Sequence, residues 1–526
     1  MTLEKKPLST YFIPSLADIL FLSVFFRLAF YRGSGLLNDS DTGWHIRVGE
    51  YIINNLSIPR HDIFSFITPP LPWNAYEWLA EVIMAVIHGS FGLTGIVLFF
   101  AFMIAMVNYL LFHMLRRCDG NILIAVIVAV LVIASSTSHW FARPHIFTQL
   151  LLIVSYIILD DYQSGKNNRL YLLPFLVLLW VNLHGGFIMG IILVGIYFIG
   201  NFIETFFVKG DGRAISLRKV KVLGVVGFFC VITSLANPNG YHTLLLPIET
   251  MSSTYTMDYI QEFLSPNFHE PLVFKYIFFL LIALLALSRK RLNAIELILV
   301  IFLLNMALFS IRHVQLFAMI VAPIIVRQST TLLDTCRGRF ADLLQKKGAG
   351  IAAIDASTRG VTWVVVGLLV VITAVAVGQV HFEFDPKTKP VAAVEFLKRE
   401  PIQGNMFNSD QIGGYIIYAA NREYKVFYDC LAADERGISR DKEYLKVISF
   451  EPGWEKVLEK YRITWIIFDA KSSLSRFLLH NTDWRLIYAD RVAHIFVMNI
   501  PAYRYLIDRY KDVRPVAYKD NGKGEN

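Results

Sequence analysis

The feature that most constrains the fold of this chain is a series of about eleven apolar segments, each long enough or nearly long enough to cross a bilayer. A membrane-spanning helix needs roughly 20 apolar residues. The segments cover residues 11–31, 93–115, 121–138, 145–160, 169–184, 187–207, 221–236, 271–288, 292–310, 313–332 and 361–380. With 55% hydrophobic and only 17% charged residues, the chain is too apolar for a soluble globular protein. The sequence predicts a polytopic α-helical membrane protein.

The loops between these segments predict the orientation of the chain. Basic residues cluster in every second loop, near residues 116–117, 166–169, 209–221, 289–291 and 337–359. Because Lys and Arg in short loops favour the cytoplasmic side, we expect the N-terminus inside and everything after residue 381 outside the cytoplasmic (inner) membrane. These loops also account for the net charge of +8, so no nucleic acid partner is expected.

The domain organisation follows from a change in composition near residue 382. Residues 1–381 form the expected membrane domain, with a long first outer loop at 32–92. From 382 to 510 charge density rises and apolar runs shorten to strand length, which predicts a small extracytoplasmic α/β domain. Its expected elements are helices at 391–399 and 454–461, strands at 425–428 and 465–468, and a hairpin at 485–499. Residues 511–526 are a polar tail.

Two carboxylates, Asp39 and Asp41, follow the first apolar segment at the start of a predicted surface helix. At the outer edge of the membrane a carboxylate can stay ionised while it faces a lipid-borne substrate, whereas at mid-bilayer its charge would cost several kcal/mol. The pair is therefore a candidate for chemistry. The alternative is structural, since either aspartate is a suitable helix N-cap.

A second surface helix of the same loop carries Glu77 and Glu81 four residues apart, with His88 on the same face. Carboxylates at this spacing could hold a metal ion or a sugar hydroxyl. The favoured interpretation is that they form the solvated face of an amphipathic helix, since such helices need a polar face.

Polar residues also gather at the predicted outer ends of the membrane segments. Besides Trp44 and His45 in the first loop, they include His145, Asn182, His184, Asn237, His242 and His313. Together they predict a polar cavity that opens outward. Arg143 and Arg312 run against the positive-inside bias and so need an anionic partner. That partner is a phosphate of a lipid carrier or, alternatively, Asp39, Asp41 or Glu77.

Three runs carry a family resemblance: Asn38-Asp-Ser-Asp-Thr-Gly-Trp-His45, Ile58-Pro-Arg-His-Asp-Ile-Phe-Ser65 and Glu77-Trp-Leu-Ala-Glu81. With many spans and an outer α/β domain, the chain resembles the GT-C superfamily of membrane glycosyltransferases. This group includes protein O-mannosyltransferases, lipid A aminoarabinose transferases and the catalytic subunit of oligosaccharyltransferase. The resemblance covers nearly the whole chain.

The resemblance implies an inverting transfer of a sugar from a polyprenyl-phosphate donor in the membrane lipid to an extracytoplasmic acceptor, which is a lipid, a glycan or a protein. Asp39 or Asp41 would be the catalytic base. The implied donor-phosphate ligands are Arg143, Arg312, His145 and His313. The implied substrate-binding residues are Trp44, His45, Glu77, Glu81, His184, Asn237 and His242. Candidate ligands for a divalent cation, Mg or Mn, are Asp39, Asp41, Glu77 and Glu81.

The chain departs from the oligosaccharyltransferase pattern in two respects. It has no Trp-Trp-Asp-Tyr-Gly run, so N-linked peptide glycosylation is not expected, and no clear second acidic motif in its later outer loops. Two other classes of protein remain alternatives. A transporter or flippase would place its binding site near mid-membrane, and a non-catalytic envelope scaffold would leave the gathered acids and histidines without a role.

Overall fold

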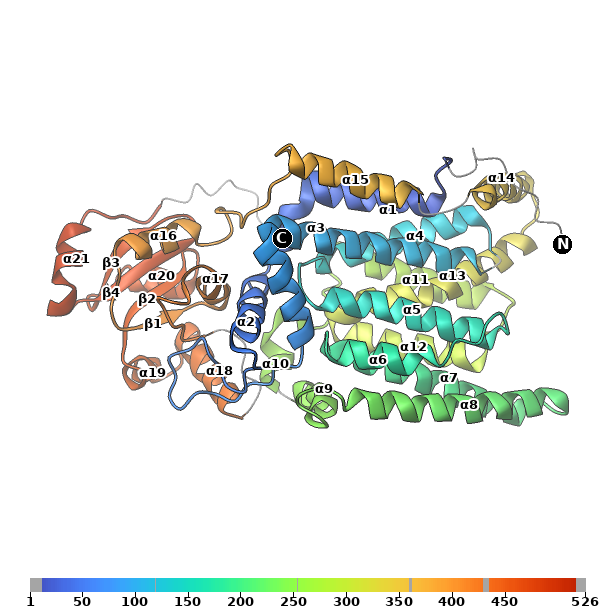
Figure 1. Ribbon diagram of the computed structural model, residues 1–526, viewed down its shortest axis with the longest axis horizontal. Coiled ribbons are helices and arrows are strands. Elements are labelled where there is room, and N and C mark those ends of the chain that lie inside the picture. Colours follow the sequence, from blue (N-terminus) through green and yellow to red (C-terminus); the bar gives the residue numbers. More distant parts are fainter. Residues whose placement is uncertain (1–11, 119, 253, 359–361, 429–434, 517–526) are drawn as a thin grey trace. The chain divides into compact units, whose positions relative to one another are not determined.

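The computed structural model describes residues 12–118, 120–252, 254–358, 362–428 and 435–516. It is mostly helical, with one small sheet (Figure 1). The chain forms two compact units. The membrane unit comprises residues 1–33 and 94–381, and the second unit comprises residues 34–93 and 382–526. The first outer loop therefore belongs to the same unit as the C-terminal residues.

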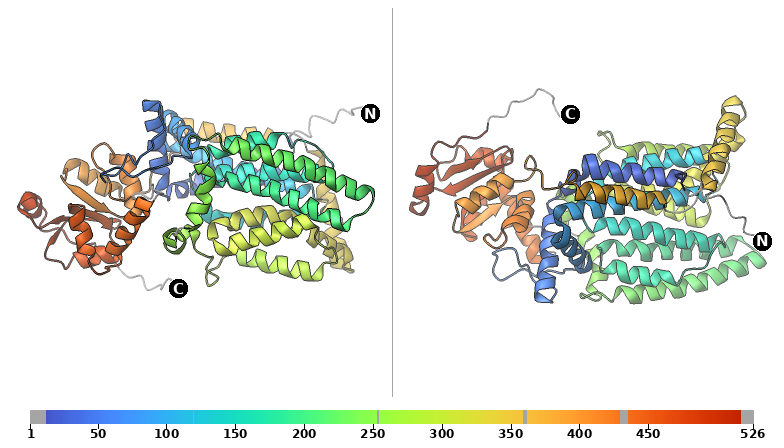
Figure 2. Two further views of the ribbon diagram at one scale, coloured as in Figure 1. Left: turned by 90° about the horizontal axis from the view of Figure 1, so that it is seen from below. Right: turned by 45° about the horizontal axis from the view of Figure 1, so that its top comes forward.

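The helices of the membrane unit follow one another along the chain and many lie side by side (Figures 1 and 2). They are α1 (Leu16–Phe26), η2 (Arg27–Arg32), the part of α3 (Trp78–Arg116) that follows Gly92, α4 (Ile122–Ser136), η4 (Thr137–His139), α5 (His145–Gln163), α6 (Leu172–Val181), η5 (Gly185–Phe187), α7 (Ile188–Phe207), α8 (Asp211–Ser234), α9 (His242–Ser252), α10 (Thr254–Tyr259), η6 (Gln261–Phe263), α11 (Val273–Leu287), α12 (Ala294–Phe309), η7 (Ile311–His313), α13 (Val314–Thr335), α14 (Arg339–Ser357) and α15 (Thr362–Ala376). Each of the eleven predicted segments coincides with one of these helices.

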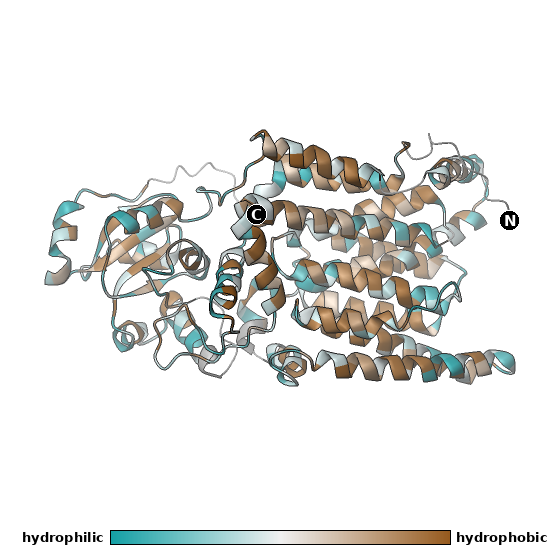
Figure 3. Cartoon of the chain, viewed as in Figure 1, coloured by the Kyte–Doolittle hydropathy of each residue, from teal (hydrophilic) through white to brown (hydrophobic). Residues whose placement is uncertain are grey.

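Six helical segments are long and apolar enough to cross a membrane, and a seventh results if α14 and α15, which are bent by 72° at their junction, form one span. Three further apolar helices, α6, α11 and α12, are shorter. Figure 3 shows the apolar residues concentrated along these helices. The structure is thus that of a polytopic membrane protein, and the count of eleven spans stays a prediction. The sequence analysis did not identify α14, which falls in a predicted inner loop.

The basic clusters of several loops meet at one end of the membrane helices. Arg117 forms an ion pair with Asp161 at 3.1 Å, and Arg116 forms one with Asp355 at 2.8 Å. Lys219 donates a hydrogen bond to the backbone carbonyl of Gln163 at 2.9 Å. Loops that sequence analysis assigned to one side therefore contact each other.

The second unit contains a four-stranded sheet in the order β1-β2-β4-β3, in which β1 and β2 are parallel and the other pairs are antiparallel. Its strands are β1 (Asn405–Asn408), β2 (Ile463–Asp469), β3 (Trp484–Ala489) and β4 (Ala493–Met498). Its helices are α2 (Asp41–Asn55), the first part of α3 up to the break at Gly92, α16 (Val391–Arg399), α17 (Asp410–Ala420), α18 (Glu435–Ile448), α19 (Trp454–Lys460), α20 (Ser473–Leu478), η8 (Pro501–Tyr503) and α21 (Arg504–Arg509).

Most of the elements expected in the C-terminal region are present, but the strand predicted at 425–428 is wrong. Val426 forms only an isolated bridge with Ser65. The backbone of the next two residues pairs with a side chain instead of a strand: Asn408 Oδ1 accepts from the amides of Phe427 and Tyr428, at 2.8 and 3.3 Å. An apolar run that reads as a strand therefore serves as an extended connection. The strand β1 and the helix α17 were not predicted.

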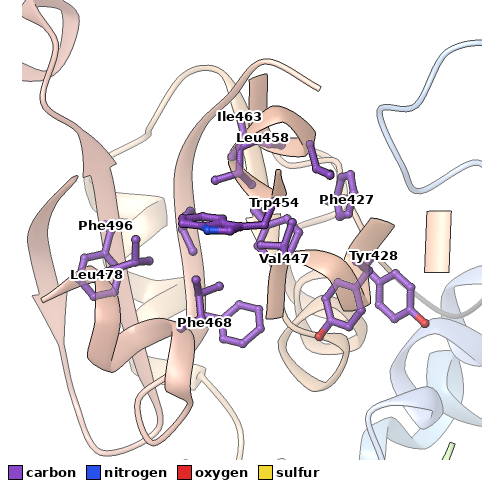
Figure 4. Packing of buried hydrophobic residues seen from close by; sticks show 14 of the residues in the cluster. Phe427, Tyr428, Val447, Trp454, Leu458, Ile463, Phe468, Leu478 and Phe496 are labelled. Carbon is purple, nitrogen blue, oxygen red and sulfur yellow. The ribbon is translucent and has the colours of Figure 1, made fainter. Parts of the chain in front are cut away.

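The core of the second unit is an aromatic and aliphatic cluster between the sheet and the helices that cover it (Figure 4). It includes Trp454, Phe468 and Phe496, all of them buried. Phe66 of the first outer loop packs against the same cluster. Because burial of apolar surface is the main favourable term in folding, this contact helps to hold the loop and the C-terminal residues together.

Candidate functional site

The two aspartates lie at the N-terminus of α2. Asp41 is its first residue, Ser40 occupies the N-cap position, and Asp39 Oδ1 accepts a hydrogen bond from the Asp41 amide at 2.9 Å. Asp39 therefore helps to cap the helix, as the structural interpretation expects of one of the pair. Both side chains are half-buried and remain in contact with solvent. The turn fixes the spacing of the two carboxylates.

Helix α17 packs closely against this end of α2. A Cβ atom on Gly414 would lie 2.7 Å from the Cβ of Ser40, and one on Gly43 would lie 2.7 Å from the Cβ of Tyr418. Ser40 Oγ and Gln411 Oε1 lie 3.1 Å apart, within hydrogen-bond distance. Glycine at both positions lets the two helices approach until Ser40, between the aspartates, touches the first turn of α17.

A buried lysine lies behind the acid pair. Lys389 is 3% exposed, and its ammonium donates to Gln411 Oε1 at 3.3 Å. Burial lowers the pKa of Lys389, and four carboxylates that attract its charge oppose that shift. They belong to Asp39, Asp41, Asp410 and Asp469. The last two follow β1 and end β2, whose carboxyl ends share one edge of the sheet. Lys389 is thus a cation within electrostatic reach of both aspartates.

The other acidic residues of the first outer loop surround His45. His45 Nδ1 lies 3.3 Å from Glu81 Oε1, and His45 Nε2 lies 3.8 Å from Glu77 Oε2. The interpretation of Glu77 and Glu81 as a solvated face is wrong, because they are only 8% and 1% exposed. Trp44 covers His45, with ring centroids 3.7 Å apart. Within the described residues, Glu81 Oε2 is buried without a hydrogen-bond partner.

The four candidate metal ligands do not form one coordination shell. Glu77 and Glu81 are engaged with His45, whereas Asp39 and Asp41 belong to the turn near Lys389. Among the described residues no three His, Cys, Asp or Glu side chains are grouped so that they could hold an ion. The arrangement therefore does not fit a divalent cation held by this residue set alone.

In the membrane unit, Arg143 has found a carboxylate partner that the sequence did not suggest. Its guanidinium lies 2.7 Å from Glu262 Oε1 in η6. The positive charge of Arg143 holds the pKa of Glu262 far below its usual range, and Arg312 acts in the same direction. Arg312 itself stacks over the ring of Phe263, 4.5 Å from its centroid. Two guanidinium groups thus share one carboxylate, which leaves an excess of one positive charge.

The remaining candidates in the membrane unit make mostly structural contacts at helix ends. His145 Nε2 lies 2.8 Å from the carbonyl oxygen of His139. His184 Nδ1 lies 2.8 Å from Thr148 Oγ1 and accepts from the Gly186 amide. Asn237 Nδ2 donates to the Val181 carbonyl at 2.9 Å, the His242 ring stacks on Tyr241, and His313 follows Arg312 in η7. These contacts connect the helix ends at which the polar residues lie.

The structure therefore gathers the candidate residues into two groups, one in each unit. The acid group contains Asp39, Asp41, Trp44, His45, Glu77 and Glu81. The cationic group contains Arg143, His145, His184, Asn237, His242, Arg312 and His313. Sequence analysis missed three partners, Lys389, Gln411 and Glu262, because each lies more than a hundred residues from the group it contacts and belongs to no motif.

No protein-family model matches the chain, and no curated protein matches it in sequence. Solved structures do match. The apo oligosaccharyltransferase of Archaeoglobus fulgidus aligns with 94% of this chain and 74% of its own, at 13% identity and a TM-score of 0.55. The oligosaccharyltransferase AglB of the same organism, in complex with an inhibitory peptide and a dolichol-phosphate, aligns with 86% of this chain and 69% of its own, at 12% identity and a TM-score of 0.51.

The chain has the oligosaccharyltransferase fold. This likeness confirms, at the level of the fold, the resemblance to GT-C membrane glycosyltransferases. In this chain the oligosaccharyltransferase fold carries its acid pair on a first outer loop that belongs to one unit with the C-terminal sheet.

Proposed function

We propose that this protein is a membrane glycosyltransferase that moves a sugar from a polyprenyl-phosphate carrier to an acceptor hydroxyl outside the cytoplasmic membrane. The proposal rests above all on the Asp39–Asp41 pair, which is half-exposed and braced by α17. It is supported by the fold of AglB, whose structure contains a dolichol-phosphate and a peptide. The proposed orientation places the N-terminus inside, eleven spans in the membrane and the second unit outside.

In the proposed reaction the acceptor oxygen attacks the anomeric carbon of the donor sugar. A new glycosidic C–O bond forms while the bond to the phosphate oxygen breaks, and the phosphate leaves with the bonding electrons and with inversion at the carbon. The acceptor proton passes to a carboxylate, which is general base catalysis. We assign this role to Asp41, because Asp39 already accepts the Asp41 amide and so positions the turn.

The donor phosphate gains negative charge as it leaves. We propose that Arg143 and Arg312 bind it, since their two charges exceed that of Glu262. His145 and His313 lie next in sequence to these cations or two residues away, and we propose that they line the same site. Trp44, His45, Glu77, Glu81, His184, Asn237 and His242 stay candidates for substrate contact. Mg or Mn stays a prediction, and no step above depends on it.

The test is an assay of purified protein with a panel of polyprenyl-phosphate sugars and crude envelope acceptors. The readout is release of free polyprenyl phosphate together with formation of a glycosylated product. Loss of a general base typically costs 10²–10⁴-fold in rate. We expect Asp41→Asn to lose activity by about that factor, and Asp39→Asn, which keeps a capping oxygen, to lose less.

Both variants should keep the thermal unfolding temperature of the wild type, because Asn also serves well at helix starts. Unchanged turnover by Asp41→Asn would remove this residue from the mechanism. The alternative as a flippase predicts movement of the labelled donor across a vesicle membrane without any glycosylated product. A scaffold would show neither donor turnover nor donor movement.

A further inference from the structure

A solvent-open basin of about 450 Å³ lies in the second unit, at the end of α2 that is remote from the acid pair. One wall is the C-terminal half of α2, and the other is the segment that follows α17 together with residues 63–64. Its polar lining includes Arg47, Glu50, Asn54, Asn421, Arg422 and Lys425.

One of the three cations is already neutralised. Arg47 donates to the Tyr418 carbonyl and to Glu50, and its guanidinium lies over the Tyr418 ring. His88 braces the same pair through Tyr418 Oη at 3.0 Å and Glu50 at 3.5 Å. The hydrogen bonds from His88 and Arg47 lower the pKa of Glu50, which keeps it ionised. Arg47 and Glu50 are therefore a fixed, neutral floor of the basin.

The other two cations carry an uncompensated charge. Arg422 and Lys425 are exposed, and within the residues that the structure describes neither forms an ion pair with a carboxylate. Lys425 donates to the backbone carbonyl of Ile63, which orients its ammonium without neutralising it. The basin thus has a net charge of about +2, and an anionic group entering it would gain charge-assisted hydrogen bonds.

The rest of the lining suits hydroxyl groups. The side-chain amides of Asn54, Asn55 and Asn421 each offer two donors and an acceptor, and Tyr51 offers an aromatic ring. Amides and aromatic rings around a fixed ion pair are typical of a surface that recognises a polar ligand with many hydroxyls, since every hydroxyl both donates and accepts.

The basin and the acid pair belong to the same helix pair. Ser40 contacts Gln411 at one end, and Arg47 contacts the Tyr418 carbonyl farther along, so α2 and α17 run beside each other. At a rise of 1.5 Å per residue, the ten residues from Asp41 to Tyr51 span about 15 Å. A ligand in the basin is thereby held at a fixed distance from the candidate base.

We propose that this basin binds an acidic oligosaccharide, which carries carboxylate or phosphate groups and serves as the acceptor. Its anionic groups contact Arg422 and Lys425, its hydroxyls contact the asparagine amides, and its far end extends along α2 toward Asp41. The role as acceptor rests on the proposed function, whereas the binding itself does not.

The experiment measures equilibrium binding of fluorescent tetragalacturonate to the full-length protein in detergent, with neutral maltotetraose as the matched neutral probe. We expect the wild type to bind tetragalacturonate and to discriminate against maltotetraose. The double variant Arg422→Gln/Lys425→Gln should weaken binding at least about tenfold, because it removes two charge-assisted contacts. The control Lys398→Gln/Arg476→Gln removes the same charge from exposed positions outside the basin and should bind as the wild type does.

Three results would overturn the proposal: no binding by the wild type, equal binding of both probes, or equal loss in the basin variant and the control. A phosphorylated tetrasaccharide, competed with inorganic phosphate, distinguishes a glycan ligand from a simple anion. Asp41→Asn should bind tetragalacturonate unchanged. Failure of glycosyl transfer with intact binding would therefore count against the proposed function alone, and failure of binding with intact transfer would count against the basin alone.

Discussion

At the scale of single residues, Asn408 shows how one buried side chain replaces a strand. It is 0% exposed, and its amide donates to the Tyr428 carbonyl at 2.8 Å while its oxygen accepts from the Phe427 and Tyr428 amides. Without these bonds several backbone groups would be buried without partners, and each such group costs about 1–3 kcal/mol. Asn408 therefore allows the segment before residue 429 to remain extended but unpaired.

We expect Asn408→Ala to destabilise the second unit by about 3 kcal/mol, since it leaves backbone donors and an acceptor unsatisfied. Chemical denaturation followed by tryptophan fluorescence would measure it. The matched control is Asn405→Ala, which removes a single bond to the Tyr461 carbonyl and should cost about 1 kcal/mol. Equal effects of the two substitutions would contradict this account of Asn408.

Glu262 makes a prediction about pH, because the cation of Arg143 depresses its pKa. A carboxyl whose pKa is lower in the folded state stabilises the protein above its unfolded pKa, near 4.5, and loses that contribution as pH falls below it. At neutral pH, Glu262→Gln should cost about 1–2 kcal/mol, between the values for exposed and buried pairs.

The measurement is thermal unfolding in detergent across pH. The gap in unfolding temperature between wild type and Glu262→Gln should narrow as pH decreases below about 4.5. The exposed Glu249→Gln serves as the control and should show no such gap at any pH. A gap for Glu262→Gln that stays constant in acid would argue against the ion pair with Arg143.

At the scale of elements, the pair formed by α2 and α17 depends on two glycines. Gly414 faces Ser40, where an added Cβ would also lie 2.8 Å from the Ser40 carbonyl oxygen. Backbone cannot give way as a flexible side chain can, so any larger residue must push the two helices apart. The spacing of the acid pair from α17 is therefore set by the absence of a side chain.

Gly414→Ala should destabilise the second unit by about 1–3 kcal/mol through overpacking and should lower glycosyl transfer as well, because Ser40 links the two aspartates. The control is Gly89→Ala in α3, where a new Cβ meets nothing within 4 Å. This control should be neutral or slightly stabilising, since alanine favours helix more than glycine does. Unfolding curves and turnover of both variants decide the matter, and a neutral Gly414→Ala would refute the packing argument.

Local patterns explain which elements were predictable. The surface helix that became α2, the helix at 391–399 and the hairpin at 485–499 each have a periodicity that the sequence displays directly. By contrast, β1 has only four residues, and the Gly413-Gly414 pair makes α17 read as a turn, because glycine is unfavourable within helices. Its glycines serve packing against a helix more than 350 residues away, which no local pattern records.

The candidate site was predictable only in part for the same reason. Asp39 and Asp41 stand out because two acids follow an apolar segment, and Glu77 and Glu81 stand out by their spacing. The burial of Glu77 and Glu81 depends on His45 and on the close approach at Gly49, which are tertiary contacts. Likewise, the partners Lys389 and Glu262 become visible only once distant segments are folded together.

At the scale of the whole molecule, the chain divides its candidate chemistry between two units. The acid pair belongs to residues 34–93, and the cations Arg143 and Arg312 belong to the membrane unit. The fold is shared with archaeal oligosaccharyltransferases at only 12–13% identity. Helix packing and apolar pattern are therefore preserved with very few common residues, as expected when many apolar side chains fill similar positions.

The proposed orientation can be tested by labelling single cysteines in a background without native cysteines. We expect Asn38→Cys and Arg476→Cys to react with a membrane-impermeant maleimide in intact cells, since both positions are assigned to the outside. Arg291→Cys should react only after permeabilisation, because its loop carries one of the basic clusters. Labelling of Asn38→Cys only in permeabilised cells would reverse the orientation and remove the acid pair from the outer surface.

The grouping of residues 34–93 with 382–526 has a consequence for biosynthesis. About 290 residues must be translated between these two parts. At 5–20 residues per second, this takes roughly 15–60 seconds. During that interval Phe66 has no apolar cluster to pack against and Ser40 has no Gln411 to contact. A ribosome that stops early would therefore release a chain whose first loop is open to proteases, so that quality control can remove it before it competes for lipid substrates.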